Sequence, residues 1–305
     1  MKKQISLSFN KIYIGLFLFL ITLCFYCIPN PNVFTNFCLF GIFVIMIGSV
    51  KELLNAAKVT KSKFVQIIFF IFVFLFFCYF LSFLLNFFQN KGSGFFPQIQ
   101  EEQPIIKLLQ KLFVKEYFLF CFLFFLICLW IFFLFIHKFR TEHLNFFLLI
   151  LLYIVFSSAC FFTLVYLNYK WFLYLFIITI SSDSFAFLGG ILFGENLLYP
   201  SVSPKKTWEG FFCGFIVSFI IILCVFGFQT IPFCFFTFFN CIMSQFGDLI
   251  SSKLKRDFSI KDLGSIIPGH GGLLDRFDSL LFLSFCVIAL LSNDFIYKNI
   301  SIIII

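Results

Sequence analysis

The sequence predicts an all-α integral membrane protein with about nine transmembrane helices and a cytoplasmic N-terminus. Hydrophobic residues make up 62% of the 305-residue chain and charged residues only 12%, about half the charged fraction of an ordinary soluble domain. The apolar residues, with Phe at 58 positions, form repeated runs of about twenty residues along the whole chain. The basic residues gather in the short segments between alternate runs.

The apolar runs are long enough to cross the roughly 30 Å hydrocarbon core of a bilayer. That core offers no water to satisfy backbone groups, and the runs lack the alternation of barrel strands, so we expect helices. The candidate spans lie near residues 12–28, 33–50, 64–88, 117–136, 144–167, 171–193, 210–228, 231–250 and 280–297.

The distribution of Lys and Arg indicates the orientation of these spans. With the N-terminus inside, 16 of the 22 basic residues fall in cytoplasmic segments, in agreement with the positive-inside rule. The basic residues left on the other side are Lys91, Lys107, Lys111, Lys115, Lys170 and Lys298. We therefore attribute the net charge of +8 to topology. Because no nucleic-acid-binding module is visible, we expect no nucleic acid as a partner.

The chain divides into two predicted regions. Residues 1–116 hold the first three spans and a segment, residues 90–116, in which Lys107, Lys111 and Lys115 recur every four residues beside apolar residues. This spacing is typical of an amphipathic helix on the membrane surface, and we assign it no catalytic role. Residues 117–305 hold the other spans and are the predicted catalytic region.

Ionisable residues near the apolar runs concentrate in two cytoplasmic segments. A charge in or beside a membrane is costly unless it has a partner or a function, so such residues are candidates for a site. The first segment, residues 181–210, contains Asp183, Lys205 and Lys206. The second segment covers residues 247–278. Its carboxylates, which stand among Lys, Arg and Gly, are Asp248, Asp262, Asp275 and Asp278.

This combination of residue types suits a site for a divalent cation and a polyphosphate. Carboxylates bind Mg²⁺, Lys and Arg neutralise phosphate oxygens, and Gly allows backbone N–H groups to approach an anion. We therefore expect phosphoryl or nucleotidyl transfer to a substrate held in the membrane.

Single residues also have simpler interpretations. Four basic residues could serve only to fix topology: Lys205, Lys206, Lys255 and Arg256. Asp275 and Asp278 would share one face of a helix, where one of them could act as a cap. Asp183 could be hydrogen-bonded to a neighbouring helix. A solitary His such as His270 is more often structural than catalytic, but between glycines it has no helical face to pack on, which adds weight to a phosphate contact or proton transfer.

Residues 252–278 resemble the diagnostic motif of the phosphatidate cytidylyltransferases, also called CDP-diacylglycerol synthases. The family pattern is Ser, one residue, an apolar residue, Lys-Arg, four residues and Lys-Asp, then after a spacer His-Gly-Gly, two residues, Asp-Arg, an apolar residue and Asp. The matching residues are Ser252, Leu254, Lys255, Arg256, Lys261, Asp262, His270, Gly271, Gly272, Asp275, Arg276, Phe277 and Asp278. The first segment is also similar to the family, in Asp183-Ser184 and in the run from Ser203 to Gly210.

The resemblance implies an activity. A phosphate oxygen of phosphatidic acid would attack the α-phosphorus of CTP, and pyrophosphate would leave, giving CDP-diacylglycerol for phospholipid biosynthesis. By analogy, Asp248 and Asp275 would hold Mg²⁺ and a second cation such as K⁺. The implied catalytic residues are Asp248, Asp275, Lys255, Arg256 and His270. The implied substrate-binding residues are Lys205, Lys206, Ser252, Lys261, Asp262, Gly271, Gly272, Arg276, Asp278 and Asp183.

Other functions remain open at this stage. A CTP-dependent lipid kinase, such as dolichol kinase, would share part of the motif but release CDP, and an enzyme for an ether lipid would meet its substrate through the same apolar surface. A transporter would often show two repeated halves and polar residues at mid-membrane, and neither is evident here. We expect a site on the cytoplasmic face of a bacterial inner membrane or a eukaryotic organelle membrane, and a homodimer is left open.

Overall fold

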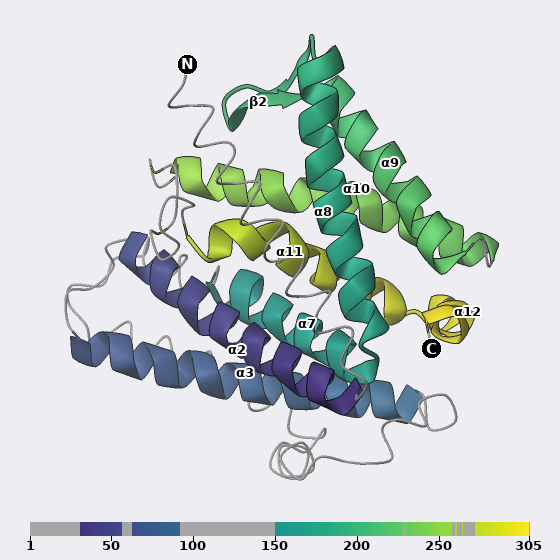
Figure 1. Ribbon diagram of the computed structural model, residues 1–305. Helices are drawn as coiled ribbons and strands as arrows, with labels where there is room; N and C mark the ends of the chain where they lie inside the picture. Colours follow the sequence, from purple (N-terminus) through teal and green to yellow (C-terminus); the bar gives the residue numbers. More distant parts are fainter. Residues whose placement is uncertain are drawn as a thin grey trace.

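The computed structural model describes residues 31–56, 63–91, 150–227, 230–257, 260, 264 and 272–304. This part of the chain is mostly helical, and its elements are labelled in Figure 1. They are α2 (Pro31–Ala56), α3 (Lys63–Lys91), the π-helical turn η3 (Ile150–Val155), α7 (Phe156–Leu167), α8 (Lys170–Phe193), β1 (Leu197–Tyr199), β2 (Ser203–Thr207), α9 (Trp208–Phe226), α10 (Ile231–Asp257), α11 (Leu274–Leu291) and α12 (Asp294–Ile304).

Four of the described helices are long and apolar enough to cross a membrane. They are Asn36–Leu54 within α2, then α8, α9 and α10, and two shorter apolar stretches follow the same pattern at Val73–Leu85 and Leu152–Leu167. Six predicted spans coincide with these helices. The predicted spans 12–28 and 117–136 lie outside the described residues, as does the amphipathic segment beyond Lys91. The count of nine spans and the cytoplasmic N-terminus stay predictions.

The structure corrects two details of the predicted fold. The span predicted at residues 280–297 is wrong in its bounds, because α11 ends at Leu291 and α12 begins at Asp294. The side-chain oxygen of Asn293 accepts hydrogen bonds from Phe295 N (3.0 Å) and Ile296 N (3.3 Å), and this N-cap starts a new helix. The chain is also not purely α-helical, because β1 and β2 form a short antiparallel hairpin.

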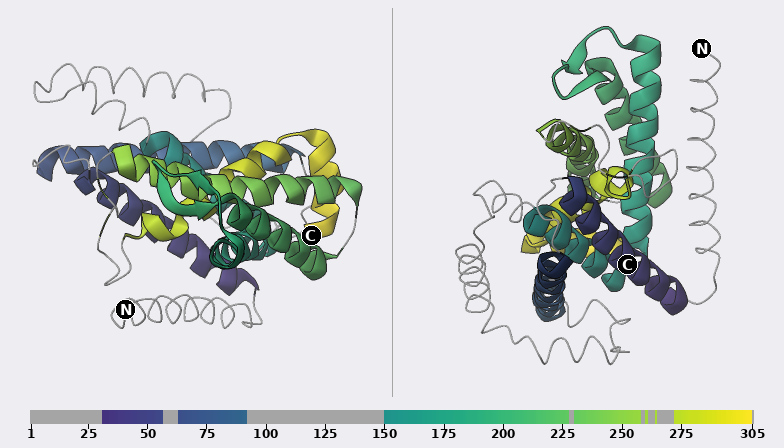
Figure 2. Two further views of the ribbon diagram at one scale, coloured as in Figure 1. Left: turned by 90° about the horizontal axis from the view of Figure 1, so that it is seen from above. Right: turned by 90° about the vertical axis from the view of Figure 1, so that its left-hand side faces the viewer.

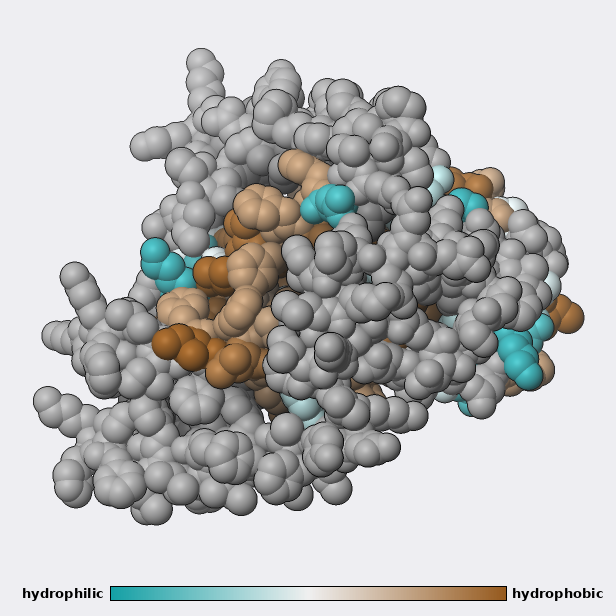
Figure 3. Space-filling model, turned by 90° about the horizontal axis from the view of Figure 1, so that it is seen from below, coloured by the Kyte–Doolittle hydropathy of each residue, from teal (hydrophilic) through white to brown (hydrophobic). Residues whose placement is uncertain are grey.

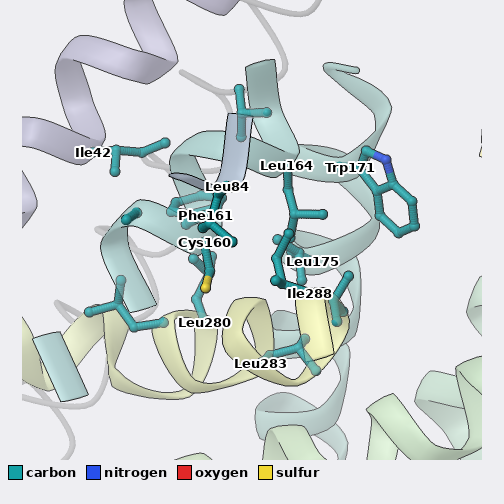
Figure 4. Packing of buried hydrophobic residues seen from close by; sticks show 14 of the residues in the cluster. Ile42, Leu84, Cys160, Phe161, Leu164, Trp171, Leu175, Leu280, Leu283 and Ile288 are labelled. Carbon is teal, nitrogen blue, oxygen red and sulfur yellow. The ribbon is translucent and has the colours of Figure 1, made fainter. Parts of the chain in front are cut away.

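The hydrophobic core centres on α7. Phe161 and Leu164 of α7 are 2% and 0% exposed, and they lie among side chains from neighbouring helices that include Leu84, Leu175 and Leu283 (Figure 4). Helix α7 packs against α2, α3 and α11. The N-terminal helices α2 and α3 and the later helices α8 and α11 therefore share one core.

Helices α8 and α9 run side by side to the hairpin, which caps their far end (Figure 1). Small residues allow this close approach. A Cβ added to Gly210 would lie 2.5 Å from Ala186 O, and one added to Gly214 would lie 2.6 Å from Ser182 O. Seen from the side, the α8–α9 pair carries the hairpin beyond α10 (Figure 2). The two motif-bearing segments thus meet where this pair crosses α10.

The outer surface is apolar over much of its area. Phe212, Ile216 and Ile220 recur every four residues on α9 and are about half exposed, at 53%, 49% and 51%. The described surface seen from below is also mainly hydrophobic (Figure 3). Contiguous apolar patches of this kind are rare on soluble monomers, and they suit contact with lipid.

Candidate active site

The hairpin that carries the two predicted lysines is anchored at the junction of α8 and α9. The Thr207 hydroxyl accepts a hydrogen bond from Gly210 N at 3.2 Å and caps α9. The Glu209 carboxylate accepts from Asn196 Nδ2 at 2.8 Å and from the backbone N–H groups of Glu195 and Asn196. These bonds fix both ends of the hairpin, so the short strand β2 can hold its side chains in place.

Strand β2 presents one of its two lysines to α10. Lys206 Nζ lies 2.7 Å from Asp248 Oδ2, with the two side chains 23% and 32% exposed. Lys205, the preceding residue, is exposed, because successive side chains of a strand point to opposite faces. The structure therefore brings the first polar segment to the second through Lys206.

Asp183 of α8 lies close to the same group of charges. It interacts electrostatically with Asp248, Lys206 and Asp278, and its side chain is exposed. Carboxylates from three helices, Asp183, Asp248 and Asp278, thus lie within electrostatic range of one another, and Lys206 pairs with one of them. Both the site role of Asp183 and its alternative role as a hydrogen-bond partner of a neighbouring helix stay predictions.

A second ion pair joins α10 to α11. Lys255 Nζ lies 3.0 Å from Asp275 Oδ1, and the side chains are only 11% and 6% exposed. The other oxygen of Asp275 accepts a hydrogen bond from Gly272 N at 2.9 Å. Lys255 follows Asp248 by two helical turns on the same face of α10, about 10 Å along the helix. Asp275, which belongs to α11, therefore lies on the side of α10 that carries Asp248.

Asp278 is buried beside the first ion pair. It is 4% exposed and interacts electrostatically with Asp248 and Lys255. Its Oδ1 accepts from Ser279 N at 2.7 Å. Its Oδ2 makes no hydrogen bond of ordinary geometry among the described residues, although the Ser251 hydroxyl is near enough to interact with this carboxylate. An acceptor oxygen left without a well-aligned donor in a buried position is costly, so it is a candidate ligand for a cation.

Tyr153 is a neighbour of this group that the sequence did not reveal. It lies on the π-helical turn η3, and its hydroxyl donates a hydrogen bond of 3.3 Å to the backbone carbonyl of Asp278. π-Helical turns occur often at functional sites. One Tyr in an apolar run gives no signal in the sequence, so only the structure identifies it.

Arg256 makes two hydrogen bonds to backbone carbonyls of the protein. Its Nε donates to Val202 O at 3.2 Å, and its Nη1 donates to Ile260 O at 3.2 Å. These bonds tie the turn of the hairpin to the end of α10. The predicted contact between Arg256 and a phosphate stays a prediction, and the observed role is to hold the hairpin against α10.

Glu52 of α2 also reaches this region, although it was not predicted. The residue is 3% exposed, and its carboxylate accepts hydrogen bonds from Leu273 N and Leu274 N at the start of α11. A signal was present in the sequence, because Glu52 is a lone acidic residue at the end of an apolar run. It was missed because it lies far from both polar segments.

The remaining predicted residues are placed only in part. Ser252 lies on α10 one turn after Asp248, and Arg276 is exposed on the first turn of α11. Gly272 lies just before α11. Four predicted residues lie outside the described residues: Lys261, Asp262, His270 and Gly271.

The donor set fits Mg²⁺ together with a polyphosphate. The described part of the chain contains no cluster of three His, Cys, Asp or Glu side chains arranged to hold a metal by themselves. Mg²⁺ usually takes only one or two carboxylates and completes its shell with water and substrate phosphates. The carboxylates of Asp248, Asp275 and Asp278 offer such oxygens. The expected ligands are therefore compatible with the arrangement.

Comparisons with known proteins agree with the motif. The sequence model of the cytidylyltransferase family matches residues 9–293. Phosphatidate cytidylyltransferase 4, chloroplastic, of Arabidopsis thaliana is 47% identical over 108 residues, which are 34% of this chain and 27% of that protein. Phosphatidate cytidylyltransferase of Bacillus subtilis (strain 168) is 43% identical over 107 residues, or 33% of this chain and 40% of that protein. The match therefore spans less than half the length of these relatives.

Proposed function

The chain belongs to the cytidylyltransferase family, and from this premise we propose that it transfers the cytidylyl group of CTP to phosphatidic acid. The products are CDP-diacylglycerol and pyrophosphate. The observation that best supports this proposal is the meeting of the two polar segments at the Lys206–Asp248 ion pair of 2.7 Å. Asp183 and Asp278 add carboxylates to the same place, so acidic and basic groups suited to cations and phosphates lie together.

The proposed reaction requires two anions that repel each other to meet in line. Lys206 and Lys255 are paired with carboxylates in the structure. When the nucleotide and the lipid bind, these ammonium groups would turn to phosphate oxygens, which are also anionic acceptors. Asp248 and Asp275 would then be available to hold Mg²⁺ and a second cation such as K⁺. The lysines thus balance the carboxylates until the substrates arrive.

Catalysis would come from alignment and charge neutralisation. Bound Mg²⁺ would neutralise phosphate oxygens and polarise the α-phosphorus. The protein would hold the attacking oxygen of phosphatidic acid opposite the leaving pyrophosphate, with Lys206 on one side and Lys255 on the other. No protein nucleophile is needed, because the lipid phosphate is itself the nucleophile. Its acyl chains would lie against apolar helix surface, with the site at the cytoplasmic face.

Product identification tests this proposal. The purified full chain is incubated with CTP labelled at the α-phosphorus, Mg²⁺ and phosphatidic acid in mixed micelles. We expect the label in the lipid fraction as CDP-diacylglycerol, with release of pyrophosphate, and no turnover after chelation of Mg²⁺. In a second assay dolichol replaces phosphatidic acid. Formation of labelled CDP and phosphorylated dolichol in that assay would show that the protein is a lipid kinase instead. An ether analogue of phosphatidic acid is assayed in parallel. The ratio of the two rates measures the selectivity for ester-linked acyl chains over ether-linked alkyl chains.

A further inference from the structure

The buried carboxylate of Glu52 binds the start of α11 from another helix. Its Oε1 accepts from Leu273 N at 2.7 Å and its Oε2 accepts from Leu274 N at 3.0 Å, across separations of 221 and 222 residues. Glu52 is only 3% exposed. Both of its oxygens are therefore used by two consecutive amides, and the contact joins the N-terminal and C-terminal parts of the chain.

This contact replaces a cap that α11 lacks locally. The first N–H groups of a helix have no partner inside the helix, and Leu273, which precedes α11, makes no side-chain capping bond. A carboxylate at this end is favoured by the partial positive charge of the helix N-terminus. The same two hydrogen bonds make the burial of Glu52 tolerable in an apolar interior.

The Glu52 carboxylate is closely surrounded by glycines, at which any side chain would collide with it. A Cβ added to Gly264 would lie 2.6 Å from Glu52 Oε1, and one added to Gly272 would lie 2.6 Å from Glu52 Oε2. One turn earlier on α2, a Cβ at Gly48 would lie 2.7 Å from the side chain of Leu273. Gly48 thus allows α2 to approach Leu273 closely, and Gly264 and Gly272 allow the backbone at those two positions to lie against the Glu52 carboxylate.

The contact is adjacent to a residue of the proposed site. Three consecutive amides precede Asp275: Gly272 N donates to Asp275 Oδ2 at 2.9 Å, and the next two donate to Glu52. The other oxygen of Asp275 binds Lys255. Without Glu52, the amides of Leu273 and Leu274 would lose their acceptor and compete for the neighbouring Asp275 carboxylate.

We propose that Glu52 is a positioning residue for Asp275: by binding the amides of Leu273 and Leu274, it keeps the first turn of α11 fixed and the Asp275 carboxylate directed to Lys255. The proposal rests on the proposed function in so far as Asp275 serves that reaction. It explains why an acidic residue of α2 is buried more than 220 positions away from the motif that it supports.

Hydrogen exchange tests the contact without reference to activity. In Glu52→Gln the side chain keeps its size, but its nitrogen cannot accept, so one amide loses its partner and the charge is gone. We expect amides in a peptide covering residues 272–278 to exchange at least about tenfold faster in this variant. Glu195→Gln, which changes an exposed Glu, is the matched control and should leave that exchange unchanged. Equal exchange in Glu52→Gln and wild type would overturn the proposal.

Kinetics separate positioning from a general loss of stability. A smaller folded fraction lowers the maximal rate but does not alter half-saturation. A displaced Asp275 should raise the half-saturating Mg²⁺ concentration about fivefold or more in Glu52→Gln, with the KM for phosphatidic acid within about twofold of wild type. An unchanged Mg²⁺ requirement would contradict the proposal. If the wild-type chain makes no CDP-diacylglycerol, the proposed function fails, while the exchange experiment still decides whether Glu52 holds α11.

A second variant covers the case in which Glu52→Gln does not fold. Gly264→Ala retains Glu52 but places a methyl group 2.6 Å from its Oε1, which should displace the carboxylate from Leu273 N. We expect the same faster exchange in residues 272–278 and the same higher Mg²⁺ requirement. Wild-type exchange and Mg²⁺ dependence in a folded Gly264→Ala protein would show that Asp275 does not depend on the Glu52 contact.

Discussion

Lys255 of α10 and Asp275 of α11 form an ion pair of 3.0 Å whose side chains are 11% and 6% exposed. The pair therefore links two helices at a position that solvent hardly reaches. Asp275 also accepts a hydrogen bond from Gly272 N, so its carboxylate is held on both oxygens. This arrangement allows its role in the reaction and its role in stability to be tested separately.

Asp275→Asn should abolish turnover while the protein stays folded and inserted in the membrane. Asn has the same shape and can still accept from Gly272 N, but it carries no charge to bind a cation. We expect kcat for CTP-dependent conversion of phosphatidic acid to fall about 100-fold or more. The assay is release of pyrophosphate, with size-exclusion chromatography in detergent as the control for folding. Turnover near the wild-type rate would remove Asp275 from the proposed metal ligands.

Lys255→Met should destabilise the protein more than Asp275→Asn does. The Met variant leaves the Asp275 charge buried without its cation, and breaking a buried pair in this way costs about 3 kcal/mol or more. Asp275→Asn leaves the Lys255 ammonium, which sits on a longer and slightly more exposed side chain and can turn toward water. The double variant Lys255→Met with Asp275→Asn should recover most of this loss without recovering activity. Thermal unfolding of the detergent-solubilised variants measures the difference. Equal stability of Lys255→Met and wild type would show that the pair is unimportant for folding.

Lys206→Met and Lys205→Met should differ although the two lysines are adjacent. Lys206 contacts Asp248, whereas Lys205 is exposed on the other face of the strand. We expect Lys206→Met to raise the KM for CTP or for phosphatidic acid about tenfold, as for loss of one charged hydrogen bond. Lys205→Met should change either KM much less. Equal increases in KM for the two variants would show that the contact with Asp248 does not distinguish Lys206 from Lys205. Unchanged kinetics in the double variant would assign both lysines to topology.

Gly210→Ala should loosen the junction that carries the hairpin. The added methyl group would lie 2.5 Å from Ala186 O, a backbone atom that cannot move without separating α8 from α9. Overpacking of this kind costs about 1–3 kcal/mol, and the KM effects expected for Lys206→Met should appear in part. The matched control is Gly41→Ala on α2, where a Cβ would meet nothing within 4 Å.

The control should raise the stability slightly, by about 0.5–1 kcal/mol, because Ala favours a helix more than Gly does. Melting temperatures in the same detergent compare the two variants. If both variants melt at the same temperature, the close approach of α8 and α9 does not limit stability. The prediction concerns the junction alone, since Gly41 lies on a different helix.

The sequence was sufficient to place helices in apolar runs, because a bilayer leaves the backbone few alternatives. Helices α8, α9 and α10 cover the predicted spans 171–193, 210–228 and 231–250 closely. The span predicted at 280–297 begins and ends several residues beyond α11, because a hydropathy average does not detect a helix N-cap. Asn293 starts a new helix with two hydrogen bonds, and a hydrophobicity window averages over such a residue.

The hairpin could not be predicted from its residues. β2 contains Pro204, Lys205 and Lys206, none of which favours a strand. Its pairing depends on anchors at Thr207 and Glu209, and these become visible only when α8 and α9 lie side by side. The register of β1 against β2 is therefore a consequence of tertiary packing.

The site could be predicted where its residues are close in sequence. The motif of residues 252–278 predicted that its charged residues act together, and the structure places two of them, Lys255 and Asp275, in contact. Their role in a reaction stays a prediction. Tyr153 was missed because it is a single polar residue in an apolar run, and Glu52 was missed because it lies far along the chain from both polar segments. Their relation to α11 depends on how distant helices pack, which spacing along the chain does not encode.

The distance along the chain between Glu52 and Leu273 bears on how the protein is made. A ribosome adds about 5–20 residues per second, so the 221 residues between them correspond to about 10–40 s of synthesis. Throughout this interval Glu52 exists without the amides that it will bind. A newly inserted α2 must therefore leave the carboxyl group of Glu52 to water at the membrane boundary until α11 emerges, and burial of this group is a late event of biogenesis.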